Sequence, residues 1–358
     1  MRLVAELERQ ARASEDRTAL PERQHLKTQL SRWENGHVVP GEMYRALFRA
    51  IYRTTDEALG FPAAPSSVLT DAADLLSQIA TARVIGPTSA SAFAAQVETI
   101  RVLDRQLGAP TALAQLRGVT RAVEGLLSHA VLPAAREPLA AVLADAAALA
   151  GWQALDLGDV KQAWTLHETA KAAAREAGDV PALAHAMGQQ AYVLLDAGAT
   201  EDAVQLIRAT TEVTGRKVPA VLRAWLSAAE AEACAALRDD AGSRRALDDA
   251  ASVLPSGDDL RDLPYLALDD AHLARWRGNV LARLGDGEAT RDLYQALATM
   301  DATFIRARAG LECDLAQAHV TRGDVSEARR HVANARQLAK QTGSVRQRRR
   351  IDTLARAA

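Results

Sequence analysis

A glycine recurs at nearly even spacing through the second half of the chain. Each copy is followed five residues later by Ala or Thr, and seven residues further on by Ala, Thr or Leu; the glycines are Gly158, Gly198, Gly285 and Gly323. Because glycine ends a helix in the left-handed conformation without a steric penalty, each one predicts a tight turn between two helices. Asp240-Ala241-Gly242 fills the gap in the series. The chain is therefore predicted to repeat a helix pair about five times between Leu139 and Lys340.

Small residues are also expected inside these helices, where two helices approach closely. Gly151 and Gly278 each lie seven residues before a turn glycine. Aromatic residues make up only 4% of the chain, alanine is abundant and β-branched runs are scarce, which favours helices over strands. A helix pair of this kind cannot bury its faces alone, so the pairs should stack into an α-solenoid with a concave surface. The sequence predicts an all-α protein with no sheet.

Prolines and glycines divide the rest of the chain. Phe61 to Ser67 carries two prolines and two serines and is predicted to be a linker. Helices are expected over 71–83, 91–107 and 112–131, with a junction bracketed by Pro133 and Pro138. The predicted organisation is a head over 1–61, a linker over 62–69, a helical connector over 70–138 and a repeat domain over 139–358. A terminal helix from Arg346 to Ala357 would close the chain, and its arginines are read as a solvated face.

The head contains a helix with one apolar and one polar face. Leu26, Leu30 and Trp33 recur at i, i+4 and i+7, which places them on one side of a helix. The opposite side is polar and cationic, with Lys27, Thr28, Ser31, Arg32 and Asn35. Gly36 is expected to end this helix. The apolar side should dock inward, which leaves the polar side free to meet a partner.

A second short helix should follow, opened by Pro40. Its predicted core face is formed by Tyr44, Leu47, Phe48 and Ile51, and its flank carries Arg45, Arg49 and Arg53. Thr54 and Glu57 have the order of a capping box, which predicts one more short turn ending at Gly60-Phe61. Short helices with tight stops are typical of helix-turn-helix heads.

The run Ser31-Arg32-Trp33-Glu34-Asn35-Gly36, followed by Pro40, resembles the signature of the xenobiotic-response-element (XRE) type, the Cro and lambda repressor-like helix-turn-helix. The resemblance covers about Leu3 to Phe61. It implies that Pro21 to Asn35 contains a recognition helix that reads double-stranded DNA in the major groove. It also implies that the DNA-contacting residues are Lys27, Thr28, Ser31, Arg32 and Asn35. Dimers of such heads bind palindromic sites, so a homodimer is expected.

The head departs from this pattern at two places. Arg2 to Arg12 resembles the second helix of the family, so the first helix is expected to be missing and the head to be N-terminally truncated. Ala13 to Leu20 stands where the family has a tight turn and is predicted to be a loop insertion. Glu34 lies in the last turn of its helix, next to the negative end of the helix dipole, and should need a cation as partner.

The repeated helix pairs resemble degenerate tetratricopeptide repeats, lengthened from a period of about 34 residues to 40 residues between Gly158 and Gly198. In such repeats, ligands contact the first helix of each pair. Carried over to this chain, the implied ligand-facing residues are Asp145, His185, Tyr192, His272, Arg275, Asn279 and Gln317. Arg275 and Asn279 stand at i and i+4, so together they could hold a carboxylate of a signalling peptide or small ligand.

No feature of the sequence indicates an enzyme, a cofactor or a metal site. The eight histidines show no pair at metal-ligand spacing, and no phosphate-binding loop or nucleophile elbow is present. Cys234 and Cys313 stand alone, which indicates reduced, buried thiols. With no apolar run of membrane-spanning length, the protein is expected to be soluble and cytoplasmic.

Two functions remain open. In the first, the chain is a transcriptional regulator that binds DNA through its head and dimerises or senses a ligand through its repeats. In the second, the truncated head no longer binds DNA and the chain is a repeat-based interaction protein for proteins or peptides.

Overall fold

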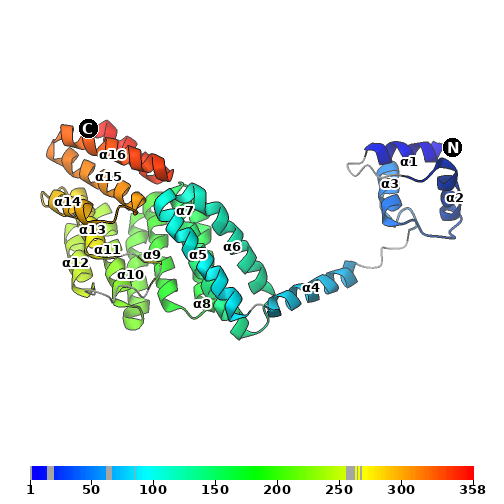
Figure 1. The fold of residues 1–358 in the computed structure, drawn as a ribbon, viewed down its shortest axis with the longest axis horizontal. Coiled ribbons are helices and arrows are strands. Elements are labelled where there is room, and N and C mark those ends of the chain that lie inside the picture. The colour runs from blue at the N-terminus through cyan, green and yellow to red at the C-terminus, as the bar shows by residue number, and fades with distance from the viewer. Residues whose placement is uncertain are drawn as a thin grey trace. The chain divides into compact units, whose positions relative to one another are not determined.

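A computed structural model describes residues 2–13, 20–61, 67–84, 86–254, 263, 265–266 and 268–358. Within these residues the protein forms α-helices, one short 3₁₀ helix and no strand, so the all-α prediction is confirmed. The chain divides into two compact units, Met1–Ser77 and Gln78–Ala358. Each unit has its own buried core, and each is described separately below (Figure 1).

The first unit is built on three helices, α1 (Arg2–Ala13), α2 (Arg23–Glu34) and α3 (Glu42–Tyr52). Its core is formed by seven buried residues: Val4, Leu7, Ala11, Leu26, Leu30, Leu47 and Phe48. Trp33 lies at the edge of this core, with its ring centroid 4.6 Å from Tyr44 and 5.9 Å from Phe48. The apolar faces expected on α2 and α3 therefore pack against each other.

The ends of these helices differ in part from the expectation. Gly36 does take the left-handed conformation after α2, with φ of 69°. Pro40 does not open α3, because Gly41 is its N-cap and the helix begins at Glu42. Beyond α3, residues 56–60 form hydrogen-bonded turns, and Thr55 rather than Thr54 accepts the backbone N–H of Ala58.

Arg45 is not a flank residue of α3. Its side chain is buried, its Nε donates to the carbonyl oxygen of Pro40 at 2.9 Å, and it lies 3.8 Å from Asp56. The expectation was wrong because an arginine beside the core can bury the aliphatic part of its side chain when carbonyl and carboxylate oxygens bind its guanidinium. The predicted insertion over 13–20 lies mostly outside the described residues, as does most of the predicted linker. Helix α4 (Ser67–Val84) follows.

The second unit begins with α5 (Pro87–Leu107), α6 (Ala109–His129) and α7 (Pro133–Asp156). The expected junction between Pro133 and Pro138 is a helix instead, with Pro138 inside α7. Pro133 is tolerated at the first position of the helix because the backbone N–H groups of the first turn have no partner within the helix, whereas Pro138, the sixth residue, costs α7 one backbone hydrogen bond. Helix α7 is the one described helix that is long and apolar enough to cross a membrane, and 78% of its apolar window is buried against other helices. That burial is consistent with a core helix of a soluble protein.

Ten helices of the second unit form five antiparallel pairs that stand side by side (Figure 1). The first two pairs are α7 with α8 (Val160–Glu176), and α9 (Val180–Ala197) with α10 (Thr200–Thr214). The 3₁₀ helix (Gly215–Lys217) then leads to α11 (Ala220–Ala236), which pairs with α12 (Asp240–Val253). The last pairs are α13 (Asp270–Leu284) with α14 (Ala289–Thr299), and α15 (Ile305–Arg322) with α16 (Val325–Thr342). This packing is consistent with the predicted α-solenoid.

The turns between the paired helices lie where the glycine series predicts them, with one exception. Gly158, Gly198, Gly285 and Gly323 all have φ between 76° and 83°. In the third pair, however, the left-handed residue is Arg238, with φ of 62°, and Gly242 lies in the first turn of α12. The glycine of the Asp240-Ala241-Gly242 run was therefore the wrong marker. A non-glycine residue can take the turn position at some steric cost, so the series itself did not reveal it.

The internal glycines do mark close helix contacts. A Cβ atom on Gly151 would lie 2.8 Å from the ring of His167 on α8, and one on Gly278 would collide with Leu293 on α14. Paired helices thus approach each other more closely than any larger residue allows.

The two ends of the solenoid meet. Helices α15 and α16 contact α5, and the terminal helix α17 (Val345–Ala357) contacts α7. At this seam the Ser344 hydroxyl donates to Asp156 at 2.6 Å, Pro110 packs on Gly343, and Gly108 lies against the backbone of Thr342. The two ends of the repeat domain are therefore in contact along this seam.

Candidate functional site

The inner surface forms a cavity of about 610 Å³ that is partly open to solvent. Its walls come from α5, α7, α9, α11, α13, α15 and α17, and from Tyr265 and Leu266 before α13. The first helix of every pair therefore faces inward and the second faces outward. A cavity of this size lies within the usual range for sites that hold a small ligand.

Six of the seven residues predicted to face a ligand line this cavity, namely His185, Tyr192, His272, Arg275, Asn279 and Gln317. The seventh, Asp145, is not among the lining residues. Its carboxylate instead accepts two hydrogen bonds, of 2.5 and 2.6 Å, from Arg101, which does line the cavity. Asp145 thus orients a wall residue.

Aromatic rings form one side of the cavity. Trp152 meets Tyr192 edge to face at 5.7 Å, and Tyr192 accepts a hydrogen bond of 3.2 Å from the indole of Trp276. His185 lies between two rings, 4.5 Å from Tyr265 and 5.3 Å from Trp225. These contacts fix flat apolar surfaces that a ring or an acyl group could stack on.

The polar part of the wall carries an excess of positive charge. The lining residues include eight arginines against five carboxylates, a formal excess of three positive charges. Most of the arginines are engaged: Arg306 with Asp104 and Asp156, Arg346 with Asp196, Arg350 with Asp314, Arg283 with Glu232, and Arg101 with Asp145. These pairs fix the wall, and the surplus favours an anionic occupant.

The sequence reading was wrong about the arginines of the terminal helix. Arg346 and Arg350 were expected on a solvated face, yet both line the cavity and pair with carboxylates of other helices. Arg346 also lies over the rings of Trp152 and Tyr192, at 5.7 and 5.8 Å. Helix periodicity alone could not show this, because the contacts depend on α17 returning to the start of the solenoid.

The charged wall changes the protonation of its neighbours. Burial acts to raise the pKa of Glu232, but the attraction of Arg283, Arg346, Arg275 and Arg350 outweighs it, so the pKa is lowered. Burial, helped by the charge of Arg101, lowers the pKa of His185 to about 3. At neutral pH the cavity therefore holds an ionised glutamate and an uncharged imidazole.

Arg275 differs from the paired arginines. It forms no ion pair with any described residue, its buried Nε has no hydrogen-bond partner, and its guanidinium lies 4.9 Å from the ring of Trp276. Three further wall groups are buried without a partner: the hydroxyl of Tyr265 and the amide oxygens of Gln189 and Gln347. Since buried polar groups are usually satisfied, this set indicates where a ligand would bind.

Asn279 does not share that role. Its amide donates to Asp314 and its Oδ1 accepts a hydrogen bond of 3.1 Å from Arg283. Both ends of the side chain are used within the wall, so the expected pairing of Arg275 with Asn279 around a carboxylate does not fit. The i, i+4 spacing is present, but it does not show which polar atoms are already engaged.

In the first unit, the polar side of α2 faces solvent. Thr28, Ser31, Arg32 and Asn35 are exposed, and Lys27 is half-buried. Some of these side chains bond locally: Thr28 donates to the carbonyl of Gln24 at 3.1 Å, and the Asn35 amide donates to the carbonyl of Ser31 at 2.6 Å. Glu34, also exposed, has no ion-pair partner among the described residues.

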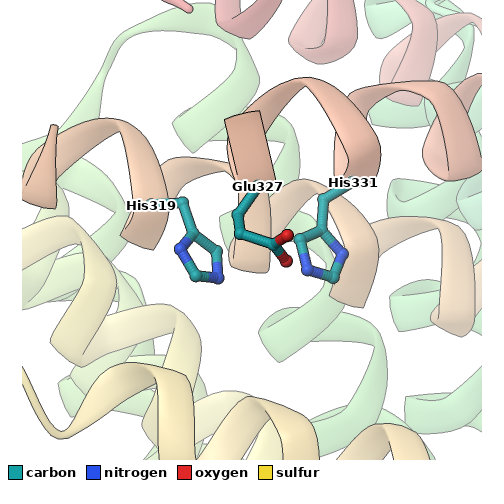
Figure 2. A group of neighbouring side chains, drawn as sticks. All are labelled: His319, Glu327 and His331. Atoms are coloured by element: carbon teal, nitrogen blue, oxygen red, sulfur yellow. The ribbon is translucent and has the colours of Figure 1, made fainter. Parts of the chain in front are cut away.

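A third cluster was missed by the sequence reading. His319 at the end of α15 lies beside Glu327 and His331 of α16 (Figure 2). No pair of histidines had metal-ligand spacing in the sequence. The signal that could have found the cluster is a histidine just before the turn glycine Gly323, together with a Glu and a His at i and i+4 just after it.

Comparison with protein-family models, with curated proteins and with solved structures gave no match for this chain.

Proposed function

We propose that this protein is a cytoplasmic, sequence-specific DNA-binding transcriptional regulator whose repeat domain binds a ligand in the cavity. The observation that carries the proposal is the convergence of six residues, chosen from repeat position alone, on one cavity that has unpartnered polar groups in its wall. Buried polar groups are usually hydrogen-bonded, so the unpartnered groups in this wall are available to a ligand.

The ligand is proposed to be an anion with a flat or apolar part. Arg275 and the excess of arginines suit a carboxylate or phosphate, and the rings around Tyr192 suit a stacked group. A volume of about 610 Å³ fits a small molecule or a very short peptide. A long extended peptide is disfavoured because α17 closes the groove.

The head is proposed to read DNA through α2. Its exposed Thr28, Ser31, Arg32 and Asn35 lie opposite the buried Leu26 and Leu30, which is the arrangement that a helix needs to enter the major groove. Lys27 flanks this surface. Two copies of the chain would place two such helices on a palindromic site, so a homodimer is part of the proposal.

The test of DNA binding is selection of sequences from a random duplex pool by the full chain at several salt concentrations. We expect one palindrome to be enriched, with affinity that falls steeply as salt rises. Arg32→Ala should weaken binding to that site by about 1–3 kcal/mol if it contacts a base. Arg9→Ala removes an exposed arginine from α1 and serves as the matched control. If a folded chain selects no sequence, the head does not read DNA and the repeat-based interaction protein is the better reading.

The test of the cavity is a thermal-shift screen with aromatic and aliphatic carboxylates and phosphates. A ligand that binds the cavity should raise the melting temperature of the wild type, and Arg275→Gln should abolish the shift. Arg244→Gln changes an arginine on the outer helix α12 and should leave the shift intact. A shift that persists in Arg275→Gln would place the ligand elsewhere.

A further inference from the structure

We propose that His319, Glu327 and His331 form a binding site for a divalent transition metal ion of the Zn²⁺ type. One nitrogen of each histidine and one oxygen of the glutamate all lie within 4.8 Å of one another. Figure 2 shows the two imidazole rings with the glutamate beside them, where α15 ends and α16 begins. The site lies on the outer part of the last helix pair and is separate from the cavity, because none of the three residues lines the cavity.

The two histidines are buried and aim the same nitrogen at one point. His331 is fully buried and His319 is 7% exposed. The Nε2 atoms lie 3.1 Å (His319) and 2.9 Å (His331) from the same atom, the hydroxyl oxygen of Tyr294 on α14. The two Nε2 atoms therefore converge on that hydroxyl.

The other nitrogen of each ring is held by a carboxylate. His331 Nδ1 lies 2.6 Å from Glu312 Oε2, and His319 Nδ1 lies 3.3 Å from Asp324 Oδ2. When Nδ1–H donates to a carboxylate, the proton is fixed on that nitrogen and Nε2 keeps its lone pair. Metal-binding histidines in proteins typically have this arrangement, in which a carboxylate orients the ring and increases its basicity.

Without a metal, the Nε2 lone pairs of His319 and His331 must share the few hydrogen-bond donors beside them. The Tyr294 hydroxyl has one proton to donate, and it lies within hydrogen-bond distance of both Nε2 atoms. The guanidinium of Arg330 supplies the rest, with Nη2 3.1 Å from His331 Nε2 and 3.3 Å from the Tyr294 oxygen. A cation thus already stands at the place that the metal would take.

Arg330 can leave that place. Its side chain is 52% exposed, and it is bound to Glu327, whose side chain is 40% exposed, by an ion pair of 2.5 Å. When the guanidinium turns toward solvent, Glu327 loses its partner and its carboxylate is free to bind a metal. Glu327 and His331 stand at i and i+4 on α16, so both face the same side of the helix.

The donor set selects the class of ion. Two imidazole nitrogens and one carboxylate oxygen suit Zn²⁺ or Co²⁺, whereas Mg²⁺ and Ca²⁺ prefer oxygen ligands alone. Three protein ligands leave a fourth position for water or for the Tyr294 oxygen. Because the ligands and Tyr294 come from three successive helices, the bound ion would stabilise the last turn of the solenoid.

The experiment is a Co²⁺ titration of the full chain after treatment with a chelator and removal of that chelator. We expect one equivalent to bind, with the visible absorption of a tetrahedral Co²⁺ ion, and we expect one equivalent of Zn²⁺ to bleach that absorption. Glu327→Gln should weaken binding by at least about tenfold. His129→Gln, which changes a half-buried histidine on α6, should bind Co²⁺ as the wild type does.

Two variants decide whether the residues act as ligands. His331→Gln should remove the absorption, and Glu327→Gln gives the same answer at a more exposed position if the buried change prevents folding. Arg330→Ala removes the competing guanidinium and should tighten Co²⁺ binding. Absence of a saturable site in the folded wild type, or equal binding by wild type and Glu327→Gln, would overturn the proposal.

Discussion

The arginines of the cavity and the arginine on the polar face of α2 differ in whether a carboxylate of the protein binds them. In the cavity, most arginines pair with carboxylates, several of which are buried, as are the partners of Arg306, Asp104 and Asp156. On α2, Arg32 is exposed and forms no ion pair with a described residue. The arginines in the cavity therefore stabilise the fold and also line a candidate ligand site. Arg32 on α2 has no such role in the fold and is free to bind a partner. The same substitution should have different consequences in the two places.

The largest effect is expected from Arg306→Ala. Arg306 is 14% exposed and its carboxylate partners are each 4% exposed, so the change leaves two buried charges without compensation. Breaking a buried pair in this way typically costs 3–5 kcal/mol of the free energy of unfolding. Urea denaturation followed by circular dichroism measures it.

The control for Arg306→Ala is Arg244→Ala, which removes an exposed arginine paired with Asp240 of α12 and with Asp286 in the turn between α13 and α14. Exposed pairs contribute about 0–1 kcal/mol. Equal losses in the two variants would show that the cavity pairs are no more important to the fold than surface pairs.

Acidification should have the next largest effect. Burial lowers the pKa of His167 and of His185 to about 3 from the ordinary value of 6.5. Below pH 6.5 the unfolded chain binds protons that the folded chain does not, so stability falls as pH falls from 6.5 toward 3. Each of these histidines contributes about 1.4 kcal/mol per pH unit in that window.

The measurement is the free energy of unfolding at several pH values between 6.5 and 5, where most carboxylates remain ionised. His167→Leu should reduce the slope by about 1.4 kcal/mol per pH unit, since the ring of His167 has no hydrogen-bond partner on either nitrogen. An unchanged slope would contradict the low pKa. His129→Leu, at a half-buried position, should alter the slope less.

Arg32→Ala sharpens the comparison from the other side. We expect its free energy of unfolding to stay within about 0.5 kcal/mol of the wild type, as for most surface substitutions, while DNA binding weakens. A large loss of stability would mean that Arg32 contributes to the head's own fold, and the DNA-binding result could then not be assigned to a contact.

A small effect on stability is also expected at one arginine inside the cavity itself. Arg275 lines the cavity as Arg306 does, but it has no carboxylate partner among the described residues and its buried Nε is unsatisfied. Arg275→Gln should therefore change the free energy of unfolding by less than about 1 kcal/mol, far less than the cost of breaking a buried pair. A loss of stability as large as that of Arg306→Ala would mean that Arg275 stabilises the fold, which would contradict its proposed role as a group kept free for a ligand.

The sequence predicted the helix pairs because their turns follow a chemical rule. Four glycines take the left-handed conformation where the series places them, and Arg238 shows the limit of that rule. Repeat position also identified six residues that line one cavity. It could not show that Asn279 is engaged by Asp314 and Arg283, because those contacts come from neighbouring helices.

Two other features required the structure for a different reason. Arg346 reaches Asp196 only because α17 returns toward the start of the repeats. His319 and His331 meet only because the turn at Gly323 folds α16 back on α15. Contacts between residues far apart in the chain leave no periodic signal in one sequence, and contacts across a turn leave a weak one.

The seam formed by Gly108, Thr342 and Ser344 has a consequence for folding. Most contacts of a solenoid are local, so its repeats can form in any order and its terminal repeats open first. Here the last contacts to form join helices at the two ends of the domain, and closing such a large loop is slow. Amide hydrogen exchange should thus protect α7 and α15 to a similar degree, because neither helix is at a free end.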